Sequence, residues 1–383
     1  MFALPYTYKP DSKLMIYHEI ETEAEFRKLL KGTDFISKIA FQNLDFRKFG
    51  KSLSGKIFTD CIFLGCQLSE AFEHRIRGEN LIFPKLNTPY NPYRNSLYNK
   101  ETLMGEYIAG RPESYRDTLD KRVYDHYMAK GKEAGDIKET LARRLHDHAI
   151  TDALHDFLHH YDEKKIVAIM GGHDLPRSDT NYLEVARISK KLAEMGYLMI
   201  SGGGPGAMEA THLGAWLAFK PEEDLTAAIS LLSKAPDYKH PMWLEKAFQV
   251  FKLYPEPACE SLGIPTWFYG HEPPTPFATH IAKYFENSIR EEGLLAIAKG
   301  GVIFSPGNAG TIQEIFQDAA QNHYLSFGIA SPMVFFNRTY WTEEIPIYPL
   351  FQELTEKGKY RNMILSGCDT CDEVVAEILK FTS

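Results

Sequence analysis

Short apolar runs alternate with amphipathic stretches through the C-terminal part of the chain. The run at 166–170 is apolar throughout and ends in two glycines, which is typical of a strand buried on both faces of a sheet. The stretch at 182–195 instead places apolar residues three or four positions apart, as an amphipathic helix does. The same alternation predicts further strands at 197–200, 225–232, 265–269, 301–304 and 332–336, and further helices at 207–219, 241–262, 277–298, 311–323, 343–357 and 372–381. It therefore predicts an α/β protein with a doubly wound parallel sheet covered by helices on both faces.

Apolar residues in the N-terminal part recur every five positions instead. Phe41 and Phe46 are five apart, and Phe58, Phe63 and Leu68 resume the same spacing. This period suits neither a helix nor an ordinary strand, but it fits one or two coils of a right-handed, pentapeptide-like β-solenoid. Because solenoid coils need stacked neighbours, an irregular β segment is the stronger of the two interpretations.

The two patterns meet after a polar and mostly helical stretch at 101–161. We therefore expect a division near Tyr161, with 1–160 as an N-terminal mixed β and helical extension of unknown role and 161–383 as the sheet domain. A chain of 383 residues is long enough for two domains with a core in each.

The charge and the cysteine content narrow the function classes. The formal net charge is -8, and without a basic excess we do not expect the chain to bind nucleic acid. The sequence shows neither a leader-like start nor an apolar run of membrane-spanning length, so we expect a cytoplasmic protein without membrane contact. Cys368 and Cys371 have the spacing of a redox motif but not its setting. The five cysteines, odd in number and scattered as reduced thiols usually are, are Cys61, Cys66, Cys259, Cys368 and Cys371.

Two glycine-rich turns are the most informative motifs in the chain. The first is Ser201-Gly-Gly-Gly-Pro-Gly-Ala-Met-Glu-Ala210, and the second is Ser305-Pro-Gly-Asn-Ala-Gly-Thr-Ile-Gln-Glu314. Each follows a predicted strand and leads into a predicted helix, whose N-terminus presents free backbone N–H groups and the positive end of a dipole. Together the turns predict one anionic group, most simply a phosphate, held between two helix N-termini.

Two common nucleotide-binding motifs are missing from the sequence. The first strand ends in Gly171-Gly-His-Asp-Leu-Pro176, which is not the Gly-x-Gly-x-x-Gly turn that binds a dinucleotide pyrophosphate. Neither glycine turn is followed by the Gly-Lys-Ser or Gly-Lys-Thr of a P-loop. A nicotinamide or flavin is therefore disfavoured, and we expect no cofactor and no metal.

The pair of turns resembles the lonely-guy (LOG) family, whose members are often labelled lysine decarboxylase-like. The hallmarks of that family are a Gly-Gly-Gly-x-x-Gly-x-Met turn and a Pro-Gly-Gly-x-Gly-Thr-x-x-Glu turn, and the likeness covers roughly 164–336. The resemblance implies a Rossmann-like fold, a homodimer or higher homo-oligomer, and a small-molecule nucleotide substrate. It implies hydrolysis of a nucleoside 5′-monophosphate, AMP-like or a cytokinin ribotide, to free base and ribose 5-phosphate. It also implies catalysis by Arg290 and Glu314, and substrate or phosphate binding by Gly203, Gly204, Gly206, Met208, Gly307, Asn308, Ala309, Gly310 and Thr311.

Three positions depart from the pattern of the family. Asn308 stands where the second motif has its second glycine, and since Asn tolerates positive φ better than other side chains, we expect the turn to keep its shape. Glu291 stands where the family commonly has lysine beside the arginine, which removes a positive charge from the pocket. Ser305 lengthens the spacing between Arg290 and the second turn by one residue. These differences concern the choice of substrate more than the reaction.

The cleavage of an N-glycosidic bond suits a carboxylate and a guanidinium. Positive charge develops on the ribose, so a carboxylate near the anomeric carbon stabilises it and orients the attacking water. We expect Glu314, one turn into its helix, beside the sugar, and Arg290, which stays charged, in a stabilising and positioning role. The alternatives are an acidic residue favoured by the helix dipole for Glu314, and a surface ion pair with Glu286 or Glu291 for Arg290.

Other features leave further roles open. A non-catalytic carrier of a nucleotide or of the molybdenum cofactor is the alternative function, since related folds bind such ligands. The segment 271–276 and Trp267 are candidates for the wall of a base pocket or, equally, for a rigid surface loop. A solvated helix face is favoured over a metal site for four residues at helical spacing: His148, Asp152, His155 and His159.

Overall fold

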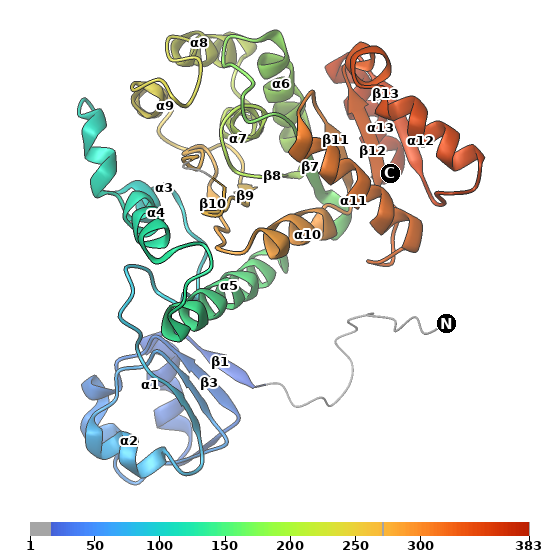
Figure 1. The fold of residues 1–383 in the computed structure, drawn as a ribbon. Coiled ribbons are helices and arrows are strands. Elements are labelled where there is room, and N and C mark those ends of the chain that lie inside the picture. The colour runs from blue at the N-terminus through green and yellow to red at the C-terminus, as the bar shows by residue number, and fades with distance from the viewer. Residues whose placement is uncertain (1–16, 270–271, 383) are drawn as a thin grey trace. The chain divides into compact units, whose positions relative to one another are not determined.

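The computed structural model describes residues 17–269 and 272–382, which form two compact units. The first unit comprises the chain up to Leu97 together with Met128–His155. The second comprises Tyr98–Tyr127 and the chain from Asp156 onward, and it contains the large sheet (Figure 1). The domain boundary placed near Tyr161 stays a prediction, and part of the chain before it, Tyr98–Tyr127, belongs to the unit with the sheet.

A seven-stranded parallel sheet forms the centre of the second unit. Its strand order is β10-β9-β8-β7-β11-β12-β13. The chain runs outward from β7 to β10 on one side and then from β11 to β13 on the other, so the order reverses between β7 and β11. This is the predicted Rossmann-like doubly wound sheet, in which ligands bind at the carboxyl ends of the strands that flank the reversal. The strands are β7 (Ile166–Met170), β8 (Leu198–Ser201), β9 (Ser261–Gly263), β10 (His280–Ile281), β11 (Gly301–Phe304), β12 (Pro332–Phe336) and β13 (Ile364–Cys368).

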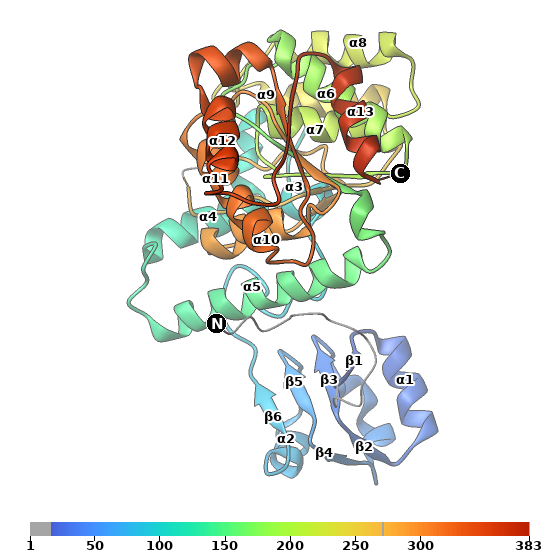
Figure 2. The same ribbon diagram turned by 90° about the vertical axis from the view of Figure 1, so that its right-hand side faces the viewer.

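Helices cover both faces of this sheet, as Figures 1 and 2 show. The helices α6 (Thr180–Glu194), α7 (Ala207–Trp216) and α13 (Cys371–Thr382) share one core with Val167 and Ile169 of β7. The helices α10 (Asn287–Ile297) and α11 (Ala309–Tyr324) contact each other, and α10 also contacts β7. Because both faces are covered, every residue of β7, β8, β11 and β12 is buried, which explains their uninterrupted apolar runs. Further helices of the chain are α1 (Glu23–Gly32), α2 (Glu70–Ile76), α3 (Lys100–Met104), α4 (Leu119–Lys130), α5 (Ile137–Leu158), α8 (Glu222–Leu232), α9 (Trp243–Leu253) and α12 (Ile347–Glu356).

Several predicted elements differ from the structure. Residues 225–232 belong to α8 and not to a strand, because three acidic residues stabilise its first turn and Leu225 and Ile229 lie on one buried face. The strand expected at 265–269 lies earlier, as β9, and the helix expected from 277 begins only at Asn287, after β10. No predicted strand corresponds to β13, whose residues are mostly only half-buried.

The first unit is built from stacked parallel strands. Phe41 of β3 pairs with Phe63 of β5, and Phe46 and Phe58 pack against these rings. The aromatic residues picked out by the five-residue period are therefore buried in one core. One sheet contains β1 (His18–Ile20), β3 (Ile39–Gln42), β5 (Ile62–Leu64) and β6 (Leu81–Phe83), and a second contains β2 (Phe35–Ser37) and β4 (Ile57–Thr59).

The segment Tyr98–Tyr127 is tied to the rest of the second unit through Asp120. The buried carboxylate of Asp120 accepts hydrogen bonds from the Tyr115 hydroxyl at 2.6 Å, from the Trp267 indole at 2.9 Å and from the Lys283 ammonium. Three donors, one of them charged, compensate for the cost of burying the carboxylate. This contact fixes the chain at Trp267, close to residues that line the candidate site.

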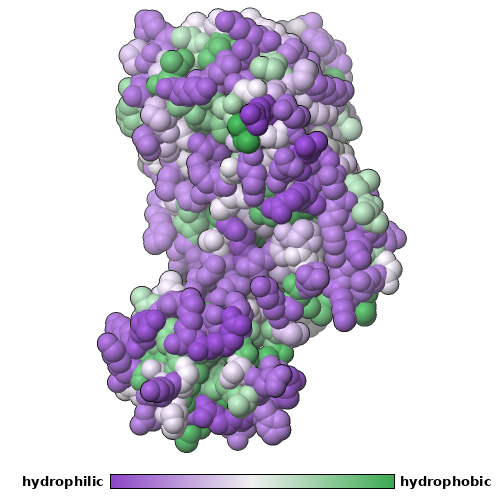
Figure 3. All heavy atoms as spheres, turned by 90° about the vertical axis from the view of Figure 1, so that its left-hand side faces the viewer, coloured by the Kyte–Doolittle hydropathy of each residue, from purple (hydrophilic) through white to green (hydrophobic). Residues whose placement is uncertain are grey.

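Surface hydropathy and helix length bear on membrane contact, and the ionisation of Cys368 and Cys371 bears on redox chemistry. On the face drawn in Figure 3, hydrophilic residues cover most of the surface and hydrophobic residues lie between them in small groups. Within the described residues, no helix combines the length and the apolar character needed to cross a membrane. Burial raises the pKa of Cys368 to about 12 and that of Cys371 to about 11, so both thiols are protonated at neutral pH.

Candidate functional site

A cavity of about 470 Å³ opens at the carboxyl ends of β7, β8 and β11, where the strand order reverses. Two helices, α10 and α11, and both glycine turns contribute to its wall. The predicted site residues that line it are Met208, Arg290, Asn308, Ala309, Gly310, Thr311 and Glu314. The described lining does not include four other residues of the prediction: Gly203, Gly204, Gly206 and Gly307.

The second glycine turn presents the N-terminus of α11 to the cavity. Its first turn, Ala309–Ile312, contains no acidic residue, so the positive end of the helix dipole is not neutralised from within the helix. The N-cap residue Asn308 has φ -96°, so the expected use of a positive φ is wrong. The Asn308 side chain instead donates to Asp174 Oδ2 at 3.0 Å. The Ile312 N–H donates to Asn308 O at 3.0 Å, whereas the N–H groups of Ala309, Gly310 and Thr311 precede the helical acceptors and therefore point to an anion site.

Two glycines of the second turn have different surroundings. A Cβ added at Gly307 would come within 2.3 Å of Thr311 Oγ1, so glycine allows the turn to close against the helix. A Cβ added at Gly310 would meet no atom of the described residues within 4 Å. Packing within the protein therefore explains Gly307 but not Gly310, whose bare Cα faces the cavity.

The first glycine turn packs closely against its neighbours. Gly203 N–H donates to Ser201 Oγ at 3.0 Å, and Ala207 N–H donates to Gly172 O at 3.1 Å. A Cβ at Gly206 would come within 2.3 Å of Gly172 O, and φ is +69° at Gly206 and +71° at Gly203. Glycine is therefore required at both positions by the backbone itself. The N–H groups of Gly203 and Ala207 are thus already bonded within the protein, in contrast to those at the start of α11.

The positive end of α7 is matched by a buried carboxylate. Glu209, in the first turn of α7, accepts hydrogen bonds from Arg177 Nε at 2.7 Å and from the Tyr182 hydroxyl at 2.9 Å, and all three side chains are buried. Because a carboxylate at a helix N-terminus compensates for the dipole, α7 offers an anion less than α11 does. From this turn, Gly202 and Met208 reach the cavity.

The guanidinium of Arg290, on α10, lies between Gly202 of the first turn and Ile264 after β9, which together are called its seat. Its Nε donates to Ile264 O at 2.8 Å, and its Nη2 is so close to Gly202 that a Cβ there would come within 2.5 Å of it. Its Nη1 is 3.8 Å from Glu314 Oε1. Both side chains are only 12% exposed, so the alternative of a surface ion pair for Arg290 is wrong.

The pKa of the Glu314 carboxyl group is shifted toward neutral pH. Burial raises the pKa of Glu314 to about 7, with a further increase from Glu291 and an opposing effect from the Arg290 guanidinium. A carboxyl group with this pKa is present in both protonation states at neutral pH, which suits a general acid or base. Glu291 also lines the cavity and accepts a hydrogen bond from Asn287 Nδ2 at 2.8 Å.

Another part of the wall contains residues that the sequence did not single out as a group. His173, Tyr269 and Glu272 line the cavity, and His173 Nε2 is 3.8 Å from Glu272 Oε1. Glu272 belongs to the segment expected as a base pocket, whose first residue, His271, lies outside the described residues. Trp267 is fully buried and hydrogen-bonded to Asp120, so it is a core residue. The signal for His173 was its place directly after the glycines that end the first strand.

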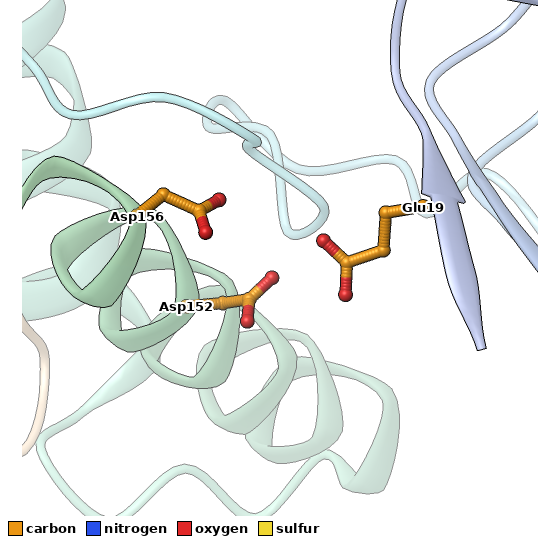
Figure 4. A group of neighbouring side chains, drawn as sticks. All are labelled: Glu19, Asp152 and Asp156. Atoms are coloured by element: carbon orange, nitrogen blue, oxygen red, sulfur yellow. The ribbon is translucent and has the colours of Figure 1, made fainter. Parts of the chain in front are cut away.

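Figure 4 draws three carboxylates, two of which belong to α5. Asp152 and Asp156 lie one turn apart on α5, and Glu19 of β1 is drawn with them in Figure 4. Exposed carboxylates often gather without a metal, and in the described part of the chain this is the group that could hold one. The group includes Asp152 but none of His148, His155 and His159, and the interpretation of these four residues as a solvated helix face stays a prediction.

No protein-family model and no curated protein matches this chain. A molybdenum cofactor binding protein from the phototrophic bacterium Rippkaea orientalis has a similar structure, with 13% identity, a TM-score of 0.37 and coverage of 57% of this chain and 97% of that chain. The molybdenum cofactor carrier protein of Chlamydomonas reinhardtii has 12% identity, a TM-score of 0.34 and coverage of 56% and 96%. The structural genomics target TM1055 has 19% identity, a TM-score of 0.36 and coverage of 56% and 98%.

The fold of this protein is assigned from its own strand order. Because these TM-scores are low, the assignment of a Rossmann-like fold rests on the order and direction of the seven strands. In the order of its two motifs and in this sheet, the chain resembles the LOG family.

Proposed function

We propose that this protein hydrolyses the N-glycosidic bond of a nucleoside 5′-monophosphate and releases free base and ribose 5-phosphate. The observation that carries the proposal is the convergence of the α11 N-terminus, Arg290 and Glu314 on one cavity. The volume of about 470 Å³ falls in the range of roughly 300–1,000 Å³ that is usual for small-molecule sites. The LOG resemblance assigns the same two side chains to catalysis.

The substrate is oriented by its phosphate in this proposal. The phosphate accepts hydrogen bonds from the N–H groups of Ala309, Gly310 and Thr311. The amides of the second glycine turn therefore bind it, and the first glycine turn contributes no N–H group. The ribose then lies beside Glu314, which is about one turn further along α11. The base extends toward His173 and the neighbouring wall of the cavity.

Hydrolysis then proceeds by attack of water on C1′ of the ribose. The ionised Glu314 carboxylate accepts a proton from the water as the C1′–N bond breaks and its electron pair moves to the base. The base takes up a proton from solvent, and Glu314 returns its own proton to solvent before the next turnover. The same carboxylate stabilises the positive charge that develops on the sugar, and Arg290 holds the substrate and the carboxylate in place. Because the ionised form acts, the rate is expected to rise through a pH of about 7 to a plateau.

The direct test uses mass spectrometry to measure ribose 5-phosphate and free base after incubation with AMP, GMP, CMP or a cytokinin ribotide. Glu314→Gln should abolish turnover and leave binding of the nucleotide measurable by calorimetry. Glu292→Gln, an exposed neighbour on α10, is the matched control and should keep full activity. Folded protein that releases no product from any of these substrates would contradict the proposal.

The same experiment separates the alternative function. A non-catalytic carrier of a nucleotide or of the molybdenum cofactor would bind its ligand without release of base, and it would retain binding in Glu314→Gln. Mass spectrometry of ligand that copurifies with the protein would then identify a pterin or an intact nucleotide.

A homodimer or a higher homo-oligomer is part of the proposal. The expected contact is the part of α11 that follows the second motif, where Tyr324 is 76% exposed. Sedimentation equilibrium should give twice the chain mass or more, and a monomer at micromolar concentration would contradict this part of the proposal.

A further inference from the structure

A buried histidine joins two strands beneath the first glycine turn. His212 Nε2 is 2.8 Å from Ser201 Oγ at the end of β8, and His212 Nδ1 is 3.0 Å from Ser261 Oγ at the start of β9. All three side chains are fully buried. Burial lowers the pKa of His212 to about 3, so the ring is neutral, and one nitrogen donates while the other accepts. The ring therefore links the two strands at any physiological pH.

Both of these strands lead directly to the seat of Arg290. Ser201 precedes Gly202, against which the guanidinium lies. On the other side, β9 leads to Ile264, whose carbonyl accepts from Arg290 Nε at 2.8 Å and whose N–H donates to Ser201 O at 2.9 Å. The seat thus has one wall from each strand, and the His212 side chain joins the two walls.

We propose that His212 is a positioning residue that sets the place of the Arg290 guanidinium beside Glu314. The two charged groups are 3.8 Å apart, which is longer than a hydrogen bond, so their separation is set by the seat and not by a direct bond between them. The inference rests on the proposed function for the catalytic meaning of this pair, but the pair itself can be measured without turnover.

The readout is the pH at which Glu314 ionises, obtained without any nucleotide. Urea midpoints of each protein and of its Glu314→Gln variant are compared across pH by tryptophan fluorescence. All four tryptophans lie in the second unit, so the signal reports the unit that contains the site. The other titratable or charged side chains that line the cavity with Glu314 are Arg290, Glu291, His173, Tyr269 and Glu272.

The proposal predicts how the pH of the Glu314 transition changes when variants of His212 and Arg290 are combined. In wild type the Glu314 transition should lie near pH 7. Arg290→Gln should raise it by about one pH unit or more, because it removes an opposite charge at close range. His212→Phe should raise it in the same direction, and the double variant should raise it no further than Arg290→Gln alone.

Controls separate this role from a loss of stability. Thr211→Val changes a buried neighbour on α7 whose hydroxyl bonds within the helix, and it should leave the transition in place. Ser261→Ala removes one of the two hydrogen bonds of His212 and should shift the transition as His212→Phe does. His212→Gln keeps a donor and an acceptor at this position, so its transition should lie at the wild-type pH.

The proposal is overturned if neither His212→Phe nor Ser261→Ala moves the transition, or if the effects of His212→Phe and Arg290→Gln add. Failure of the protein to hydrolyse nucleotides would contradict the proposed function and leave this measurement fully interpretable.

Discussion

The variant Gly310→Ala should change the affinity for a phosphate ligand without lowering the stability of the protein. Gly310 lies in the first turn of α11, and a Cβ there would meet no atom of the described residues within 4 Å. In a helix, alanine is favoured over glycine by about 0.5–1 kcal/mol, so we expect the variant to be as stable as wild type or more stable.

The same methyl group enters the space assigned to the phosphate. An oxygen hydrogen-bonded to the first-turn N–H groups lies about 2.9 Å from nitrogen, which leaves little room for an added carbon beside it. We expect ribose 5-phosphate to bind at least about tenfold more weakly, a loss of about 1.4 kcal/mol or more. Calorimetry measures this loss, and urea unfolding followed by tryptophan fluorescence measures the stability.

Gly293→Ala is the matched control for this experiment. Gly293 also lies in a helix, α10, and a Cβ there would also meet no described atom within 4 Å, but it does not belong to the described cavity lining. It should raise stability by a similar amount and leave the affinity unchanged. Equal affinity in wild type and Gly310→Ala would refute the assignment of the phosphate to this turn.

Three further expectations concern stability and are measured by urea unfolding. The pKa of Glu314 is raised from 4.5 to about 7, so the stabilising contribution of this carboxyl group is complete below pH 4.5 and is lost as the pH rises through 7. Between pH 4 and pH 8, the free energy of unfolding of Glu314→Gln should therefore increase by about 3 kcal/mol relative to that of wild type. A difference in unfolding free energy that stays constant across this range would argue against a buried carboxyl group. Gly307→Ala should destabilise the protein by about 1–3 kcal/mol, because the new Cβ would lie 2.3 Å from Thr311 Oγ1; an unchanged urea midpoint would show that the turn can relax. Arg177→Met should cost about 3–5 kcal/mol, since it leaves Glu209 buried without its ion-pair partner, and combining it with Glu209→Gln should recover part of that loss.

The central strands were predictable because their environment leaves a simple trace in the sequence. β7, β11 and β12 have the predicted bounds, since both faces are buried and every position is apolar. The run 225–232 is equally apolar, but its buried residues lie on one helical face and acidic residues precede it, so the length of an apolar run alone misled the prediction. β13, at the edge of the sheet, is partly exposed and leaves a weaker trace.

The site was predictable where local sequence determines local shape. The second turn and Glu314 belong to one strand–turn–helix segment, so their relation to the cavity follows from a short stretch of chain. The contribution of Glu272 depends on where the chain after β9 returns to the sheet, which no local pattern specifies. The close packing of the first turn, with its N–H groups bonded to Ser201 and Gly172, likewise depends on neighbouring strands.

The most direct test of the account is a crystal structure of Glu314→Gln with AMP. We expect the phosphate oxygens within hydrogen-bond distance of the N–H groups of Ala309, Gly310 and Thr311, and the ribose C1′ beside the side chain at position 314. A phosphate bound elsewhere, or a sugar remote from that side chain, would contradict the proposed reaction.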